Sequence, residues 1–280
     1  MFDINNITIK NNAMFNIVMR KPILCKMCLE RILNKKIAEL SYPESERTID
    51  YDLTSRSIRL DIYCEGEDAV YNIELQNGAY EDLPKRSRYY QDLIDIDLLK
   101  KGHEYTELKN NIVIFICTFD PFEQGRHLYT FENICIQDSS IKLDDKTTKL
   151  FLNSKGTMDD IPTPLKNFLK YIDNGEVTDE FTKQLDESVA EVRKDKKWRK
   201  IIMTVDQLIK DESKLARKEG IEEGIKEGIK EGIKEGIKEG TSLLNELNKR
   251  LIQDNRIDEL KAATTDPELQ KKLFKEYGLV

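Results

Sequence analysis

The chain has 280 residues, a formal net charge of −7 at pH 7, and charged side chains at 35% of its positions. This length exceeds that of a usual single domain, so we expect one well-packed core with an appendage. The acidic balance argues against a generic nucleic-acid binder, and the longest apolar run, 112–117, is far too short to cross a membrane. The N-terminus has no basic start followed by an apolar stretch, and five cysteines are an odd number. We therefore expect a cytoplasmic protein with reduced thiols.

The predicted elements alternate between helices and strands over the first 175 residues. Apolar side chains at helical spacing after Pro22 indicate a first helix, and β-branched and aromatic residues around Phe115 indicate a buried strand. Alternating polar and apolar side chains mark two half-buried strands, which a polar turn with Gly66 joins into a hairpin. In chain order the expected elements are a helix at 21–40, strands at 47–52, 57–63 and 70–76, a helix at 83–101, strands at 111–119, 127–137 and 149–153, and a helix at 165–173.

Beyond residue 175 the sequence is strongly charged and has helical spacing. We expect a helical extension at 176–219, a repeat at 220–240 and short amphipathic helices at 241–280; in the repeat, Gly-Ile-Glu-Glu-Gly is followed by four copies of Ile-Lys-Glu-Gly. Each glycine costs a helix about 1 kcal/mol relative to alanine, and the four-residue period makes the isoleucine stripe drift by about 40° per copy. We favour a low-complexity spacer, partly helical and partly frayed. The alternative is a glycine-faced helix that packs against a copy of itself.

The predicted hairpin carries one acid in each strand, Asp61 and Glu74, and both acids stand between apolar neighbours. Gln76 follows Glu74 by two residues and so lies on the same face, because strand side chains alternate with a period of two. Two carboxylates and an amide at the rim of a sheet can hold a hard divalent cation through oxygen. The alternative is that both acids are solvated residues on the polar face of the hairpin.

Asp61, followed after twelve residues by Glu74-x-Gln76, resembles the PD-(D/E)XK nuclease superfamily, with Gln76 in place of the final lysine. The surrounding segments are similar, in order, to the Rpn family of recombination-promoting nucleases, whose members are also described as transposases. They are Ile58-Arg59-Leu60-Asp61-Ile62-Tyr63, Tyr71-Asn72-Ile73-Glu74-Leu75-Gln76, Leu83-Pro84-Lys85-Arg86-Ser87-Arg88-Tyr89-Tyr90, Lys101-Gly102 with Tyr105 and Leu108, Val113-Ile114-Phe115-Ile116-Cys117, Asp120-Pro121-Phe122, Tyr129-Thr130-Phe131 and Phe151-Leu152-Asn153-Ser154-Lys155-Gly156. The resemblance covers about residues 14–175. It implies a restriction-endonuclease-like α/β fold, in which helices flank a mixed sheet.

The resemblance also implies the chemistry of the site. Asp61 and Glu74 would coordinate Mg²⁺ or Mn²⁺, together with the backbone carbonyl of Leu75, and the ion would lower the pKa of a bound water. The Gln76 amide would orient that water or a phosphate oxygen. Because an amide is not a strong base, the proton would leave through metal-bound hydroxide or solvent.

Glu30, on the first predicted helix, is a further candidate metal ligand. Many relatives in the superfamily place an additional acid on that helix, and Glu39 and Glu44 compete for the same role. The alternative for Glu30 is an ordinary exposed glutamate.

Basic side chains follow the second acidic strand, at the start of the helix expected at 83–101. They could bind backbone phosphates and make the affinity for DNA sensitive to salt. The alternative is a solvated cationic turn paired with Glu81 and Asp82. The candidates for contact with DNA are Arg59, Lys85, Arg86, Arg88 and Tyr89, with Tyr90 as an alternative to Tyr89.

The expected function is metal-dependent hydrolysis of DNA phosphodiester bonds by an endonuclease. The resemblance implies a role in recombination or in defence against foreign DNA. Cleavage of a duplex needs two sites or two visits, so we expect a homodimer or higher homo-oligomer, for which the tail could supply the contact. The alternative is a non-catalytic, nuclease-like scaffold that binds DNA or a protein, with the tail assembling or restraining it.

Overall fold

The computed structural model describes residues 6–41, 44–49, 58–78 and 82–279. The chain divides into two compact units, Met1–Asp206 and Gln207–Val280. The elements are α1 (Asn12–Met19), α2 (Pro22–Leu33), β1 (Glu44–Ile49), β2 (Ile58–Glu65), β3 (Ala69–Gln76), α3 (Leu83–Leu98), the short 3₁₀ helix η2 (Tyr105–Glu107), β4 (Asn110–Cys117), β5 (Leu128–Phe131), β6 (Thr147–Asn153), α4 (Thr163–Asn174), α5 (Glu180–Lys194), α6 (Lys196–Gln253), α7 (Ile257–Ala263) and α8 (Pro267–Glu276).

A mixed sheet of six strands forms the centre of the first unit, in the order β1-β2-β3-β4-β6-β5. The strands β1, β2 and β3 pair antiparallel, β4 runs parallel to both β3 and β6, and β5 is antiparallel to β6. The central strand β4 is covered on both faces, which explains its unbroken run of apolar residues. The expected α/β fold, a mixed sheet flanked by helices, is confirmed.

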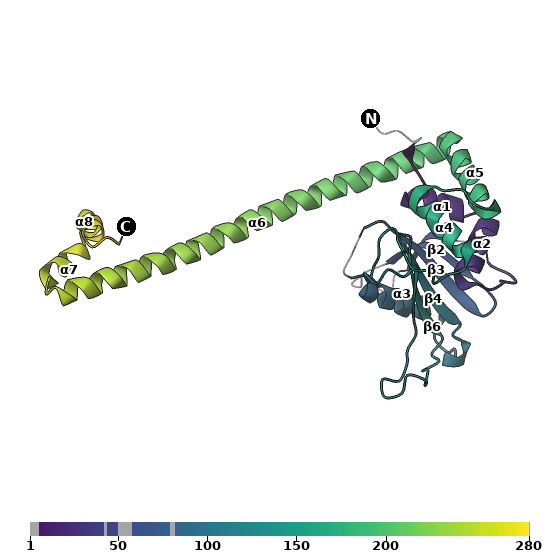
Figure 1. Cartoon of the computed structure of the whole chain (residues 1–280), viewed down its shortest axis with the longest axis horizontal. Coiled ribbons are helices and arrows are strands. Elements are labelled where there is room, and N and C mark those ends of the chain that lie inside the picture. The colour runs from purple at the N-terminus through teal and green to yellow at the C-terminus, as the bar shows by residue number, and fades with distance from the viewer. Residues whose placement is uncertain (1–5, 42–43, 50–57, 79–81, 280) are drawn as a thin grey trace. The chain divides into compact units, whose positions relative to one another are not determined.

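Helices cover both faces of this sheet (Figure 1). On the first face, Ile114 and Ile116 of β4 belong to a core that also contains residues of α1, α2, α4 and α5. On the second face, Val113 and Phe115 of the same strand pack in a core with Leu83, Leu93 and Ile94 of α3. Alternate side chains of β4 therefore pack in two separate cores, one on each face of the sheet.

The first helices differ from the expectation of one helix at 21–40. The helix α2 ends at Leu33, because Asn34 takes a left-handed conformation with a φ of 49° and caps it. Before it lies α1, whose residues from Ala13 to Met19 are all buried. Because this helix is buried on all sides, no alternation of apolar and polar residues with a helical period reveals it in the sequence.

The compact unit extends past the expected boundary at residue 175. Phe181, Leu185 and Val189 of α5 are almost fully buried in the core of the first face. The side chain of Asp179, the N-cap of α5, accepts a hydrogen bond from the backbone N–H of Thr182. It also forms an ion pair with Arg31 of α2, with 2.7 Å between the charged atoms. The helical extension is therefore in part a component of the core.

The second unit consists of the later part of α6 with α7 and α8. Leu247, Leu251, Ala263 and Leu273 form a small core, and Arg256 pairs with Glu259 and Glu276. The repeat is helical throughout, although we expected it to be frayed in part. Its isoleucines, from Ile221 to Ile237, are between 54% and 65% exposed. None of the described helices combines the length and apolar character needed to cross a bilayer.

Candidate active site

Asp61 and Glu74 lie where the pairing of the β2–β3 hairpin ends. Backbone pairing runs from Glu65 and Val70 to Ile62 and Ile73, and one further step brings Asp61 opposite Glu74. At this point hydrogen bonds from backbone to side chain take the place of backbone pairing between the strands. Glu74 Oε1 accepts a hydrogen bond from the Asp61 backbone N–H at 3.0 Å. In return, Asp61 Oδ2 accepts one from the Leu75 backbone N–H at 3.1 Å. The two carboxylates are therefore held side by side, each bonded to the opposite strand.

Strict alternation breaks down in β2 beside this pair. Leu60 and Tyr63 both pack in the core of the second face, whereas a regular strand would direct them to opposite faces. Since the register with β1 is the same on both sides of Asp61, the strand must twist strongly there rather than bulge.

Burial dominates the electrostatics of the pair. Glu74 is only 3% exposed, and burial together with the negative charge of Asp61 raises its pKa well above the ordinary value. Burial also raises the pKa of Asp61, although the Leu75 N–H, the Asn16 amide and the charges of Arg59 and Arg86 oppose the rise. A buried and a half-buried carboxylate that repel each other form a site that a cation would stabilise.

Arg86 joins the third predicted residue, Gln76, to this pair. Its Nη1 donates to Gln76 Oε1 at 3.3 Å and its Nη2 to Tyr90 Oη at 2.9 Å. The guanidinium also lies 5.9 Å from the centre of the Phe115 ring, and its charge lowers the pKa of Asp61 and of Glu74. Since α3 starts at Leu83, Arg86 falls in its first turn, within reach of the end of β3.

The oxygen atoms gathered here fit a hard divalent cation. Mg²⁺ is commonly held by one or two carboxylates and completes its shell with water, and the pair supplies both carboxylates. Two further amides lie beside them: Asn16 Oδ1 and both polar atoms of Asn72 are buried without a hydrogen-bond partner among the described residues. Asn72 nevertheless approaches Glu74 closely enough to lower its pKa. Unpartnered buried oxygens beside two carboxylates are consistent with a cation or water at this position.

The structure does not bring Glu30 to this pair. Its carboxylate accepts from the Ile37 backbone at 3.1 Å and from Lys36 at 3.0 Å, and so fastens the turn after α2. These two contacts lower the pKa of Glu30 against the opposing effect of burial, the largest of its influences. Within the described ranges there is no cluster of three or more acidic, histidine or cysteine side chains placed to hold a metal ion.

The remaining predicted DNA contacts lie on β2 and α3. Lys85 and Arg88 are exposed on α3, and Arg59 is exposed on β2, where its charge acts on Asp61. Tyr89 is half-buried against the core of the second face. Arg86, by contrast, is half-buried inside the site rather than free to clamp an outer phosphate.

The site has two neighbours that were not predicted from the sequence, Asn16 and Asn72. A third neighbour, Tyr90, was predicted only as an alternative to Tyr89. Asn72 shares a strand face with Glu74 and Gln76, so the alternation of β3 contains the signal for it. Asn16 comes from α1, and no spacing in the sequence connects that segment with β2.

Comparison with known families finds a match, and it covers most of the chain. Residues 12–226, well over half of the chain, match the family described as PD-(D/E)XK nuclease family transposase. Comparison with curated proteins and with solved structures finds no match. The matched region contains the hairpin with Asp61, Glu74 and Gln76 and the whole of the sheet. The chain therefore belongs to the PD-(D/E)XK nuclease family transposases.

Proposed function

We propose that this protein is a metal-dependent DNA endonuclease, with Asp61, Glu74 and Gln76 as its hydrolytic centre. The observation that carries the proposal is the reciprocal bonding of the two carboxylates, each to the backbone of the other strand. Buried carboxylates are costly unless they are paired or bind a cation. A nuclease of this family uses such a pair to bind a divalent ion. Binding the ion would therefore explain why the protein tolerates the free-energy cost of burying these carboxylates.

Each side chain of the centre has a distinct task. Asp61 and Glu74, with the Leu75 carbonyl, would hold Mg²⁺ or Mn²⁺, which when bound activates water and neutralises charge on the phosphate. Gln76 uses its Oε1 to accept from Arg86, so its amide nitrogen remains to donate to a phosphate oxygen or to the attacking water. Arg86 fixes that orientation and adds positive charge near the scissile phosphate.

The exposed cations on α3 support DNA as the substrate. Lys85 and Arg88 lie in the first turns of the helix that supplies Arg86, on its solvent-exposed side. Contacts of this type are made to backbone phosphates and carry no sequence information. From these contacts alone we infer a nuclease with little base preference. Its affinity for DNA should fall as the salt concentration rises.

The test is cleavage of plasmid DNA with and without Mg²⁺ or Mn²⁺. Asp61→Asn and Glu74→Gln keep the volume and one acceptor oxygen for the bonds to Leu75 and Asp61, and both should abolish cleavage. Glu67→Gln, an exposed acid in the turn of the same hairpin, is the matched control and should cleave like the wild type. Folded wild-type protein that cleaves no more than the two variants would instead favour the non-catalytic scaffold.

A role in recombination or defence and a homo-oligomer assembled through the tail belong to the same proposal. Both cuts of a duplex would then be made by two copies. Light scattering of the intact protein, with and without DNA, measures the assembly. A monomer that makes double-strand breaks at a rate linear in its concentration would contradict this part.

A further inference from the structure

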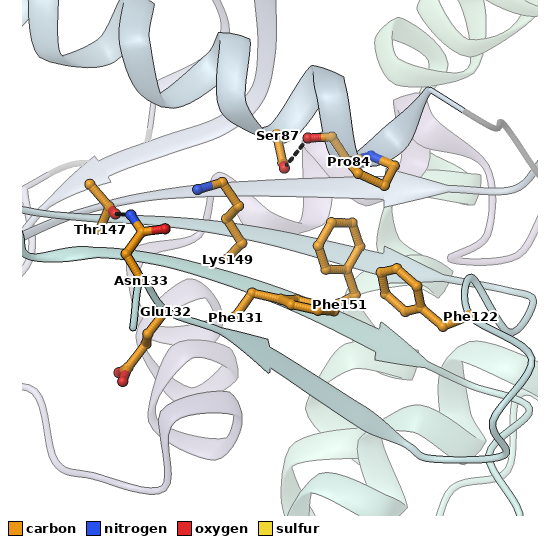
Figure 2. A pocket seen from close by; sticks show the side chains of 9 residues that line it. All are labelled: Pro84, Ser87, Phe122, Phe131, Glu132, Asn133, Thr147, Lys149 and Phe151. Carbon is orange, nitrogen blue, oxygen red and sulfur yellow. Dashed lines mark hydrogen bonds between the residues drawn. The ribbon is translucent and has the colours of Figure 1, made fainter. Parts of the chain in front are cut away.

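A pocket of about 250 Å³ opens on the second face of the sheet, beside the start of α3 (Figure 2). Three rings, those of Phe122, Phe131 and Phe151, form one side of it, with centroids 5.0 to 5.7 Å apart and tilted or edge-on to one another. The polar ends of Asn133 and Lys149 lie on the other side. Phe131 is 43% exposed, so the aromatic wall is open to a ligand.

The pocket lies in the same row of the sheet as the candidate active site. Glu74 pairs with Phe115 of β4, and Phe115 pairs with Phe151 of β6. Two strand spacings separate Glu74 from Phe151, which is about 10 Å. The first turns of α3 lie between them: Arg86 bonds to Gln76 on one side, and Ser87 lines the pocket on the other.

The polar end of the pocket has a donor with positive charge and an acceptor. Lys149 forms no ion pair with any residue that the structure describes. Burial lowers its pKa, while the charges of Asp145 and Asp92 oppose this change and the smaller effect of Arg88 adds to it. Asn133 donates its amide nitrogen to Asp145 at 2.7 Å, which leaves its oxygen as the acceptor. The acid at the rim, Glu132, is already neutralised by Lys142 at 2.6 Å.

We propose that this pocket binds one unpaired base of the nucleic acid whose backbone is cleaved at Asp61 and Glu74. The inference rests on the proposed function and names a specificity element for it. Flat π-faces stack on aromatic side chains whatever the base, and a base edge carries both donors and acceptors for Asn133 and Lys149. The volume is below the roughly 300 Å³ at which pockets for drug-sized ligands begin, so it suits a single ring system.

The same geometry explains how the rest of the strand would run. Lys85 and Arg88 are exposed on α3, the helix that supplies Arg86 to the site and Ser87 to the pocket, so the phosphates of the bound strand would contact this helix. About 10 Å is close to three base steps of a duplex. A base within a duplex is stacked and paired, so it must be unpaired or extruded to enter. We therefore expect single-stranded or distorted DNA to bind better than regular duplex.

The experiment compares two ligands of equal length, a single-stranded oligonucleotide and a chain of abasic nucleotides, in chelator so that no hydrolysis intervenes. Wild-type protein should prefer the oligonucleotide by about tenfold or more, the effect of one stacked base. Phe131→Ala should remove most of that preference, and Lys149→Gln part of it. Tyr105→Ala is the matched control, because this aromatic residue is 83% exposed and lies outside the pocket; it should leave the preference unchanged.

The outcomes separate this inference from the proposed function. If plasmid cleavage depends on Asp61 but folded Phe131→Ala and Lys149→Gln keep the wild-type preference, the base pocket is wrong and the nuclease stands. If both variants lose the same factor of affinity for the oligonucleotide and for the abasic chain, the pocket does not bind a base, and the inference is again overturned. A mononucleotide that competes as well as the oligonucleotide would assign the pocket to free nucleotides instead. Absence of both cleavage and DNA binding in the wild type would remove both proposals.

Discussion

Arg86 is the residue on which the arrangement of the site most depends. It donates to Gln76 and Tyr90, lies over Phe115, and lowers the pKa of the carboxyl groups of Asp61 and Glu74. A planar guanidinium can make these contacts at once, whereas an ammonium group acts as a single charged point. Its position in the first turn of α3 therefore couples the start of that helix to the end of β3.

We predict that Arg86→Lys lowers the rate of DNA cleavage by about tenfold while the protein stays folded. The charge is kept, but one of the two hydrogen bonds to Gln76 and Tyr90 is lost, and a bond of this type contributes about 1.5 kcal/mol or more. Single-turnover cleavage measures the rate, and Lys183→Ala, an exposed cation on α5, is the control. An unchanged rate would show that Gln76 needs no support from Arg86.

The buried pair predicts an unusual dependence of stability on pH. Because the pKa of Asp61 and of Glu74 is raised in the folded state, the folded protein binds more protons than the unfolded chain. Stability should then fall as pH rises from the unfolded value, about 4, up through the folded pKa. In the isosteric variant Glu74→Gln this loss should be smaller.

We therefore expect Glu74→Gln to melt a few degrees higher than the wild type at neutral pH in chelator, since about 1 kcal/mol corresponds to roughly 2–4 °C in a unit of this size. Mg²⁺ should raise the melting temperature of the wild type and have little effect on the variant. Scanning fluorimetry over a pH series measures both effects. A variant that melts lower in chelator at every pH would contradict the proposed repulsion.

The elements differ in how well the sequence predicts them. Alternating or continuous apolar runs predict the strands β2, β3 and β4. Alternation also predicted that β3 would be half-buried, which is wrong: all eight of its residues are buried, because its polar face lies under α3 and the site. The helix α1 does not, because its residues from Ala13 to Met19 are uniformly buried and no period distinguishes it. The twist at Asp61 was also hidden, since strict alternation would separate Leu60 from Tyr63. For this reason Asp61, Glu74 and Gln76 could be proposed from the sequence, but their neighbour Asn16 could not.

The helix α5 shows the limit of periodicity in another way. Phe181, Leu185 and Val189 recur at helical spacing, which predicts an apolar face but not what covers it. In the structure that face packs in the core of the first unit, and Arg31 of α2 holds the N-cap Asp179. A boundary at residue 175 would therefore divide the core.

We predict that a chain ending after Asp206 folds, whereas one ending after Gly175 does not. The shorter chain would leave Phe168 and its neighbours without their partner Phe181, whose ring lies 5.7 Å away, and exposing several large apolar side chains costs about 1.5–3 kcal/mol each. Circular dichroism and urea unfolding of both proteins measure the difference. Equal cooperativity and midpoint in the two would show that the domain ends at 175.

At the scale of the whole molecule, the repeat lies within the second unit, ahead of its small core of Leu247, Leu251, Ala263 and Leu273. Each four-residue copy lengthens the helix by about 6 Å, so copy number can change length without changing composition. The described isoleucines of the repeat are exposed. A Cβ atom added at any repeat glycine from Gly220 to Gly240 meets nothing within 4 Å.

This open space permits a test of the two interpretations of the repeat. Replacing Gly224, Gly228 and Gly232 by alanine should stabilise the helix by about 1 kcal/mol per site, because no neighbouring atom within the protein opposes the added methyl groups. Thermal melting followed by circular dichroism measures the gain, and light scattering measures association. If the repeat is a spacer, association and DNA cleavage stay at the wild-type level. If a second copy packs closely against the glycine face, the methyl groups keep the helices apart and association falls. Lys226→Ala, Lys230→Ala and Lys234→Ala together leave every glycine in place, so they separate a change in helix propensity from a change in close packing.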